Sequence, residues 1–430
     1  MSKAQYLLSI PSVRERCSLV FAKALTNELT NFDTDLSKIP SLVDYLSQII
    51  ARDYGTDYAS IPPHGRWQHF NVGGVARVEA LVAAWEADQV SLTEITKRLL
   101  DLFVVSVLLD AGAGNKWTYH EVGASADNVY NRSEGLAVAS LDLFKQGAFS
   151  AAGDVQPHQV NAAALAALTS DFLGKGLQVS HENPLEGLEG RAGLLKNLGK
   201  ALSNAEYFGS DGRPGNIVDY LLAHPTTDGK TVQLTTLWDA LMSGLGPIWP
   251  AGRTKLDGVS LGDAWPCSSM PQDQGEWAKI VPFHKLTQWL CYSLLVPMKK
   301  YLGLTFAGEE LQTGLPEYRN GGLLVDFGVI TLKSEPLKQG QEFGKSDIPL
   351  FTPDSDVIIE WRAVTVGFLD YLLDKVNTKL GLVGDNKAEA LSLAQLLEAG
   401  TWKAGREIAA EKRPDTKGPP IAIASDGTVF

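Results

Sequence analysis

The chain has 430 residues, of which 44% are apolar, and its 38 basic and 50 acidic residues give a formal net charge of −12 at pH 7. This apolar share is ordinary for a globular protein with a large core, and the length is compatible with one domain or two. The negative field repels phosphate backbones at long range, which argues against nucleic acid as the main partner.

The N-terminal segment and the cysteines indicate the compartment. Residues 1–17 lack the uninterrupted apolar stretch of a signal peptide. The longest apolar run, 102–109, is interrupted by a serine and is too short to span a bilayer. The three cysteines (Cys17, Cys267 and Cys291) have no CxxC spacing, so they indicate neither a zinc ribbon nor a disulfide framework. We therefore expect a cytoplasmic protein without a membrane partner; a homo-oligomer is compatible with the sequence.

Helical patterns dominate the chain. Ser91 and Glu94 form an S-x-x-E capping box, and apolar residues then repeat at helical spacing up to Leu109. Asp110 follows at the end of this helix, where a carboxylate can simply hydrogen-bond the local backbone. Three more segments have helical periodicity, namely 136–144, 194–202 and 364–376. Asn386 and Glu389 are expected to cap a late helix that carries leucines up to Leu397.

Strand patterns are few. Leu323 to Leu332 alternates weakly, and the tail 421–430 has a D-G turn between apolar residues. Three segments rich in loop residues are candidate walls of a site rather than linkers, namely 207–216, 246–276 and 333–356. We therefore predict a mainly α fold, with residues 1–430 forming a single helical domain with a few short strands.

Two short segments combine an acid with cationic side chains. In FHKLTQ, Lys285 and Gln288 are three positions apart and share one face of a helix. In PEYRNGGLL, Pro316 restricts the backbone beside Glu317, and two glycines allow a sharp bend after Arg319. A fixed acid near cations suits cleavage of a phosphorylated sugar, because the acid stabilises developing positive charge or activates water while the cations bind phosphate.

Each of these residues also has a structural interpretation. Glu317 would otherwise be a surface glutamate in a turn, and Lys285 a solvated lysine on an amphipathic helix. Arg319 would either bind a phosphate or pair with Glu317. His284 would either donate to the leaving group or act as a structural hydrogen bonder. Asp326 would either assist Glu317 or pair with Arg319.

A metal site is the less favoured interpretation of the histidines. His64 and His69 are five positions apart, which does not fit the i, i+4 spacing of a helical metal motif. Together with His120 and Glu121 they could in principle ligate a metal. We expect neither a metal nor another cofactor.

The two segments resemble the F-Y-K-x-x-Q and D-Y-R segments of the queuosine salvage proteins, which are queuosine 5′-phosphate N-glycosidases, in the same order and at similar spacing. Three weaker similarities to segments of the same family follow in the same order along the chain. They lie in residues 108–114 together with 130–144, in residues 359–366 and in residues 402–423. This resemblance implies a fold related to helix-hairpin-helix DNA glycosylases. It places Glu317 at the position of that family's catalytic aspartate, with a side chain one methylene longer than aspartate. It places Lys285 at the lysine of the F-Y-K-x-x-Q segment.

The same resemblance implies the remaining pocket residues. Asp110 and, more weakly, Glu134 lie in segments that correspond to pocket segments of the queuosine salvage proteins. Gln288 and Tyr318 belong to the two motifs and complete the set of candidate substrate-binding residues.

Over nearly its whole length, the chain resembles the uracil catabolism protein 4 family, with RWQHF, RSEGLAVAS, NPLEGLEGRAGLL, IWPAGR, HKLTQWL, EYRNGGL and the terminal SDGTVF. That resemblance implies a substrate from the ring-opening route of pyrimidine breakdown, namely N-ribosylurea as its 5′-phosphate. Hydrolysis of the N-glycosidic bond would give urea and ribose 5-phosphate. Urea leaves poorly unless protonated or hydrogen-bonded, and either His284 or Asp110 would supply that donor.

Two other functions are compatible with the sequence. An amidohydrolase would attack the urea carbonyl and release ammonia and carbamate, which requires a metal or a cysteine nucleophile; Cys291 is near His284 in sequence. Alternatively, the chain is a non-catalytic partner of the ring-opening enzyme, which predicts no turnover by the purified protein.

Overall fold

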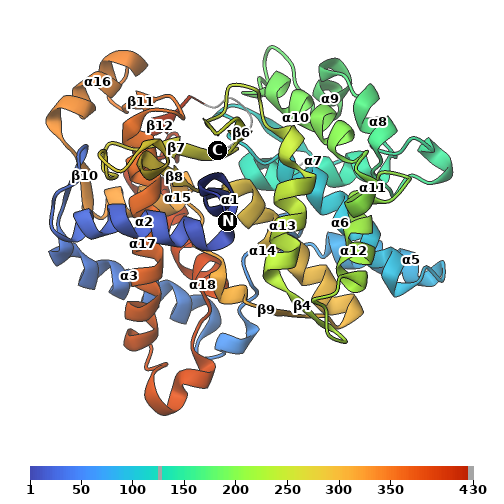
Figure 1. The fold of residues 1–430 in the computed structure, drawn as a ribbon, viewed down its shortest axis with the longest axis horizontal. Coiled ribbons are helices and arrows are strands. Elements are labelled where there is room, and N and C mark those ends of the chain that lie inside the picture. Colours follow the sequence, from blue (N-terminus) through green and yellow to red (C-terminus); the bar gives the residue numbers. More distant parts are fainter. Residues whose placement is uncertain (124–127, 425–430) are drawn as a thin grey trace. The chain divides into compact units, whose positions relative to one another are not determined.

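The computed structural model describes residues 1–123 and 128–424, and helices dominate it (Figure 1). The prediction of a mainly helical chain with short strands is confirmed. The chain divides into two compact units, each assembled from separate segments. The first contains Met1–His64, Arg253–Lys285 and Glu310–Ala424, and the second contains Gly65–Gly252 and Leu286–Glu309. Among the described residues, no helix is both long and apolar enough to cross a membrane.

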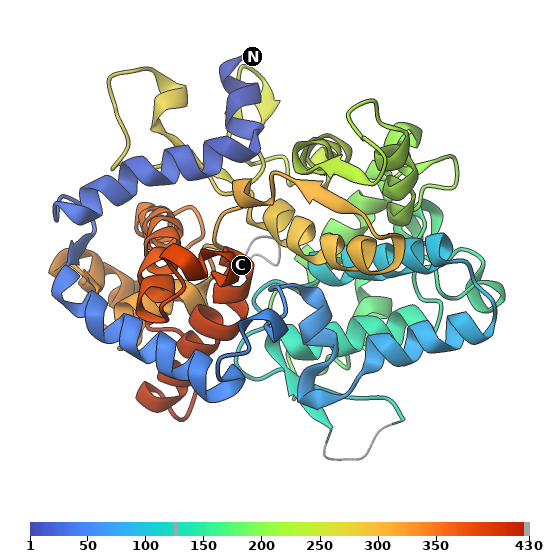
Figure 2. The ribbon, with the colours of Figure 1, turned by 90° about the horizontal axis from the view of Figure 1, so that it is seen from below.

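The first unit is organised around a long buried helix, α17 (Asp356–Lys379), which lies between α2 (Ile10–Leu25) and α3 (Ile39–Tyr54), as Figure 2 also shows. A side chain at Gly367 of α17 would collide with Phe21, so the glycine lets α17 approach α2 closely. The other helices are α1 (Lys3–Leu8), α15 (Tyr318–Asp326), α16 (Ser334–Gly344), α18 (Leu393–Leu396), a π-helix (Leu397–Thr401) and α19 (Trp402–Lys412).

The strands of the first unit form four two-stranded sheets. Three are antiparallel: β1 (Phe32–Thr34) with β10 (Ile330–Leu332), β5 (Lys255–Leu256) with β6 (Val259–Ser260), and β7 (Ala264–Pro266) with β8 (Ile280–Pro282). The fourth pairs β11 (Leu350–Phe351) with β12 (Ala422–Ile423) in parallel. Two of these sheets, β1 with β10 and β11 with β12, join segments that are distant in sequence.

The second unit contains α4 (Arg66–Phe70), α5 (Arg77–Ala87), α6 (Leu92–Leu108), α7 (Arg132–Lys145), α8 (Ala162–Ala167), α9 (Ser170–Gly176), α10 (Leu188–Ala201), α11 (Ala205–Phe208), α12 (Ile217–Ala223), α13 (Leu234–Gly244) and α14 (Lys285–Leu302), whose first residue belongs to the first unit. Its sheets pair β2 (Thr118–His120) with β3 (Val129–Asn131), antiparallel, and β4 (Thr231–Gln233) with β9 (Thr305–Ala307), parallel.

In the second unit, α6 is buried along almost its whole length. Ser91 caps its N-terminus as predicted, because the Ser91 hydroxyl accepts a hydrogen bond from the Glu94 backbone N–H at 3.2 Å. The Glu94 side chain does not complete the predicted capping box and instead binds Arg98 and Arg213. Asp101, on the same helix, accepts from the Gly215 backbone N–H at 2.7 Å and pairs with Arg213 at 2.9 Å. Burial raises the pKa of Asp101 to about 6, although the arginine and the backbone N–H groups oppose that rise.

Several predicted elements differ from the structure. Leu323–Leu332 is not one strand, because α15 continues to Asp326 and only the last three residues form β10. The segment 333–356, predicted as loop, contains α16. The late helix is capped by Ser392 through a capping box with Gln395, rather than by Asn386 and Glu389, which lie in a 3₁₀ turn. The D-G turn predicted in the tail lies outside the described residues.

Candidate functional site

Glu317 forms the N-cap of α15. Its backbone is extended, and its carboxylate accepts hydrogen bonds from the backbone N–H groups of Arg319 at 2.8 Å and Asn320 at 2.6 Å. These donors belong to the unsatisfied first turn of a helix, which favours a negative charge. Each carboxylate oxygen receives one of the two bonds. Because an ionised carboxylate has about four acceptor sites, each oxygen keeps capacity for a further donor.

The charge of Glu317 is under opposing influences. Burial raises the pKa of its carboxyl, whereas the two backbone N–H groups and the positive charges of Lys285 and Arg319 lower it, and the balance leaves the pKa above the ordinary glutamate value. The ammonium of Lys285 is therefore close enough to act on this carboxylate. The first unit thus brings together the acid and the lysine of the two sequence segments.

Asp263 fixes the start of α14, where Lys285 lies. Its side chain accepts the Lys285 backbone N–H at 3.0 Å, and its carbonyl accepts those of Phe283 at 2.9 Å and His284 at 3.2 Å. The fully buried carboxylate also binds Arg362 through two hydrogen bonds of 2.8 Å. Burial alone would raise the pKa of Asp263, but the Arg362 guanidinium and the hydrogen bonds hold it well below its usual range. Asp263 is therefore a buried anion that positions Lys285.

Two consecutive residues of α17 support both segments of the candidate site. Trp361 donates its indole N–H to the Gly321 carbonyl of α15 at 3.1 Å, and Arg362 holds Asp263. A Cβ at Gly321 would lie 2.8 Å from the Trp361 ring, so a glycine is needed at this close approach. Since one rigid helix anchors the segments of Lys285 and Glu317, their relative placement does not depend on loop packing alone.

His284 has a structural role in this arrangement. It is 1% exposed, and its Nε2 donates to the Leu7 carbonyl at 2.7 Å. Burial lowers the pKa of the ring, which favours the neutral form. Its φ of 44° is in the left-handed region, which is unusual for a residue other than glycine and occurs here between two segments held by Asp263. The structural interpretation of His284 is therefore supported by its hydrogen bond.

Arg319 and Asp326 lie at opposite ends of α15. The Arg319 guanidinium donates through Nη1 to the Lys417 carbonyl at 2.9 Å and lies 4.9 Å from the ring of Tyr318. Asp326 does not pair with Arg319, because it forms two hydrogen bonds with Arg413 of 2.8 and 2.5 Å. Asp326 therefore ties the end of α15 to the end of α19.

The second unit contains Asp110, Gln288 and Glu134. Asp110 accepts from the fully buried Arg66 at 2.7 Å, and the Arg66 Nε donates to the Ser106 hydroxyl at 2.8 Å. The loop that carries Asp110 is clamped by Arg191, which donates to the carbonyls of residues 109, 111 and 112. Gln288 is fully buried in α14, and Glu134 is 8% exposed in the first turn of α7.

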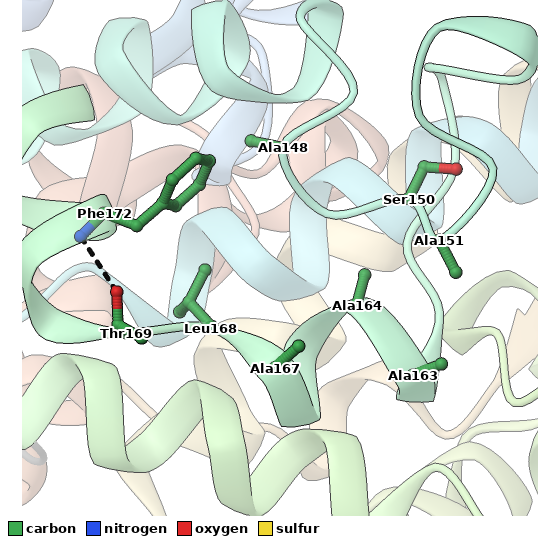
Figure 3. A pocket seen from close by; sticks show the side chains of 9 residues that line it. All are labelled: Ala148, Ser150, Ala151, Ala163, Ala164, Ala167, Leu168, Thr169 and Phe172. Atoms are coloured by element: carbon green, nitrogen blue, oxygen red, sulfur yellow. Dashed lines mark hydrogen bonds between the residues drawn. The ribbon is translucent and has the colours of Figure 1, made fainter.

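A pocket of about 450 Å³ in the second unit is formed by the loop before α8, by α8 and by the start of α9 (Figure 3). Alanines, Leu168 and Phe172 supply most of its wall, and Ser150 and Thr169 supply its hydroxyls. None of its lining residues is charged and none is a predicted site residue. The side chains that line this pocket therefore provide no charged group for acid–base chemistry or for binding a phosphate.

The histidines and cysteines do not gather into a metal-binding set in the described part of the chain. No group of three or more His, Cys, Asp and Glu side chains is placed to hold an ion there. His64 pairs with Glu398, and His69 lies 3.3 Å from a guanidinium nitrogen of Arg66. All three cysteines are free and buried, and burial raises the pKa of each thiol.

Sequence reasoning missed Asp263 and Trp361. Asp263 lies in 246–276, a segment notable only for its loop composition, and Trp361 lies in the weakly similar segment 359–366. Their roles arise from contacts between distant positions, since Asp263 binds a residue 99 positions away and Trp361 one 40 positions away.

Comparison with known proteins gives three matches. Residues 6–430 match a family described as "Protein of unknown function (DUF1688)". "Uracil catabolism protein 4" of Lachancea kluyveri is 53% identical over 440 residues, covering 99% of this chain and 98% of that protein. "Protein urg3" of Schizosaccharomyces pombe is 48% identical over 425 residues, with 99% and 98% covered. The similarity therefore extends over nearly the full length of both relatives.

Proposed function

The chain belongs to the family described as "Protein of unknown function (DUF1688)" and is a relative of uracil catabolism protein 4, and on this premise we propose that it acts in uracil catabolism as an N-glycoside hydrolase. The substrate in this proposal is N-ribosylurea as its 5′-phosphate. The products are urea and ribose 5-phosphate.

The observation that carries the proposal is that the positive charge of Lys285 acts on the Glu317 carboxylate in the first unit and lowers its pKa against the effect of burial. Cleavage of an N-glycosidic bond develops positive charge on the ribose, as in glycoside hydrolysis generally. A carboxylate held by two backbone N–H groups is already oriented, so it stabilises that charge without further reorganisation. The same carboxylate can orient the attacking water and accept its proton.

Phosphate binding is assigned to Lys285 and Arg319, with Tyr318 beside them. Among the described residues, only the Lys417 carbonyl accepts a hydrogen bond from the Arg319 side chain, and it uses Nη1. The remaining guanidinium N–H groups can bind phosphate oxygens. Binding energy from the phosphate would then position the reacting carbon against Glu317.

The finer fold assignment is also a proposal. The resemblance of FHKLTQ and PEYRNGG to the queuosine salvage proteins supports a fold related to helix-hairpin-helix DNA glycosylases. The helical content of the first unit and the position of Glu317 at a helix N-terminus are compatible with that relationship.

A cysteine-dependent amidohydrolase is less well supported. A nucleophilic cysteine must be present as its thiolate, whereas burial raises the pKa of Cys17, Cys267 and Cys291 and favours the thiol. The alternative of a non-catalytic partner makes a distinct prediction, because a partner would show no turnover on its own.

The test is a product assay with the purified full-length protein, N-ribosylurea and its 5′-phosphate. We expect urea and ribose 5-phosphate in equal amounts, and preference for the phosphorylated substrate. Release of ammonia would instead support an amidohydrolase. Absence of any product, together with specific co-purification of a ring-opening enzyme, would support the partner function.

A further inference from the structure

We propose that the side-chain oxygen of Asn320 accepts a hydrogen bond from the 2′-hydroxyl of the substrate ribose and so selects ribosyl over 2′-deoxyribosyl compounds. This inference rests on the proposed function, because it specifies the sugar that the same site takes. It starts from the position of Asn320, which is 1% exposed and lies in the first turn of α15.

Two hydrogen bonds place Asn320 beside the proposed catalytic carboxylate. Its backbone N–H donates to Oε1 of Glu317 at 2.6 Å. Its side-chain nitrogen, Nδ2, donates to the Leu315 carbonyl at 3.1 Å, and the same carbonyl accepts the Glu317 backbone N–H at 2.8 Å. The Asn320 side chain therefore folds back to the end of α15 that Glu317 caps, rather than extending away along the helix.

The two polar atoms of this amide differ in what they contact. Nδ2 binds the Leu315 carbonyl, whereas Oδ1 is shielded from solvent and has no hydrogen-bond partner among the described residues. Exchanging the two atoms would not help, because it would put an oxygen against the Leu315 carbonyl. Native proteins contain few buried acceptors without a donor, since each one costs stability. The bond to Leu315 thus explains the nitrogen of Asn320 and leaves its oxygen for another group.

The partly exposed residues of this turn show from which side a substrate reaches the oxygen. Glu317 and Tyr318 are partly exposed, whereas Arg319 and Asn320 are buried. A substrate that contacts the Glu317 carboxylate therefore lies against the start of α15 and meets Asn320 from the same side. Because the described residues hold the Asn320 amide only through its nitrogen, the amide can turn its oxygen toward a bound hydroxyl.

The stereochemistry of the substrate identifies which group donates. In a β-ribosyl compound, the leaving nitrogen is on one face of the sugar ring and the 2′- and 3′-hydroxyls are on the other. In the proposed reaction, Glu317 orients a water that attacks C1′ opposite the leaving nitrogen, so this carboxylate lies on the hydroxyl face. An acceptor beside Glu317 consequently meets a hydroxyl rather than the ureido N–H. The 2′-hydroxyl is the one on the carbon next to C1′.

A bond to the 2′-hydroxyl favours ribosyl substrates in two ways. As positive charge develops at C1′, the 2′-hydroxyl becomes a stronger donor, so its hydrogen bond strengthens in the transition state. A 2′-deoxy substrate leaves the Asn320 oxygen without a donor, because the oxygen is shielded from water. Asn320 is therefore a specificity-determining residue of the proposed site.

The test compares ribosylurea 5′-phosphate with its 2′-deoxy analogue in the full-length protein. The preference is the ratio of the two kcat/KM values, and comparing this ratio between proteins cancels the greater intrinsic lability of deoxyribosides. We expect Asn320→Ala to lower the ratio about 5- to 100-fold, through a loss on the ribosyl substrate.

Asn377→Ala is the matched control. Asn377 is also buried in the first unit and donates through Nδ2 to a backbone carbonyl, that of Leu391, at 3.1 Å. Its oxygen is already paired, because it accepts the Leu391 backbone N–H at 2.9 Å. Asn377→Ala should therefore lower thermal stability and leave the ratio unchanged.

Binding of sugar phosphates tests the inference without turnover and without a variant. The parent protein should bind ribose 5-phosphate more tightly than 2-deoxyribose 5-phosphate and 2-deoxy-2-fluororibose 5-phosphate, because fluorine cannot donate a hydrogen bond. Equal binding of the three compounds would overturn the inference, as would an unchanged kcat/KM ratio in a folded Asn320→Ala protein. Failure of the proposed function is distinct, because the parent protein would then release no urea from ribosylurea 5′-phosphate, whatever its preference in binding.

Discussion

Glu317 is both a helix cap, which must stay fixed in position, and the proposed acid–base group, which must exchange a proton. Burial favours a protonated carboxyl, whereas the backbone N–H groups of Arg319 and Asn320 favour the anion, and the net effect is a raised pKa. A carboxylate with these properties can accept a proton from water and still remain fixed in position. The residue therefore combines a helix cap, which is structural, with the acid–base role that we propose.

Replacing this carboxylate tests both roles. Glu317→Gln keeps an acceptor for one N–H, so we expect the fold to persist, with a loss of about 1 kcal/mol from the cap. Turnover should fall at least about 100-fold, because the base and its negative charge are removed. Glu335→Gln, an exposed acid in the first turn of α16, is the control. A folded Glu317→Gln protein with nearly parental turnover would exclude this carboxylate as the catalytic group.

The pH dependence of activity follows from the direction in which the pKa of Glu317 is shifted. As a base, Glu317 must be ionised, so activity should fall as the pH decreases through its folded-state pKa. Because that pKa is raised, the acidic limb should lie at higher pH than for an ordinary glutamate.

The proposed role of Lys285 in phosphate binding can be tested by comparing the phosphorylated substrate with the unphosphorylated one. Removing its ammonium should weaken binding of the 5′-phosphate substrate by about 1.5–3 kcal/mol, the range for hydrogen bonds to charged groups. Lys285→Ala should barely change the use of unphosphorylated ribosylurea. Lys338→Ala, whose side chain is 72% exposed in α16, serves as the control. Equal weakening for both substrates would show that Lys285 does not contact the phosphate.

At the scale of elements, the buried Asp263–Arg362 pair holds the start of α14. Asp263→Asn leaves a buried guanidinium without its counter-charge, so we expect a loss of about 3–5 kcal/mol in the free energy of unfolding, measured with guanidinium chloride. The folded-state pKa of Asp263 is depressed, so its stabilisation is present above the ordinary carboxyl pKa and is lost as the pH falls toward the folded value. A variant as stable as the parent, with unchanged acid sensitivity, would contradict this role.

The contact between α15 and α17 depends on Gly321. A Cβ there would lie 2.8 Å from the Trp361 ring, so Gly321→Ala should displace α15, reduce stability by about 1–3 kcal/mol and reduce turnover. Gly193, inside α10, has open space where a Cβ would lie and is the matched control. Gly193→Ala should be neutral or stabilising by about 0.5–1 kcal/mol. If the two variants behave alike, close packing at Gly321 does not position α15.

Local signals explain which elements the sequence predicted well. The α6 helix is identifiable because its Ser91 cap and its apolar repeat are encoded within a few turns. The alternation from Leu323 to Leu332 is misleading, because it crosses the end of α15 and continues into β10. Ser392 is easily missed as a cap because the 3₁₀ turn before it also has capping residues. Periodicity does not distinguish such adjacent short elements.

At the scale of the whole molecule, the candidate site was predictable only in its two sequence motifs. Glu317 and Lys285 can be found because their segments resemble known motifs, and the structure brings both into the first unit. The roles of Asp263 and Trp361 could not be inferred from the sequence, because their hydrogen-bond partners are distant in sequence and only the folded chain brings them into contact. The pairing of Asp326 with Arg413 was likewise invisible, because it depends on α15 and α19 lying side by side.

We propose that this protein cleaves the N-glycosidic bond of a ribosyl phosphate. The most direct test follows ribosylurea 5′-phosphate, labelled with carbon-13 at the urea carbonyl, by NMR during incubation with the purified protein. We expect the labelled carbon to appear as free urea while ribose 5-phosphate accumulates at the same rate. Appearance of the label in carbamate or bicarbonate would contradict this proposal, as would an unchanged substrate signal.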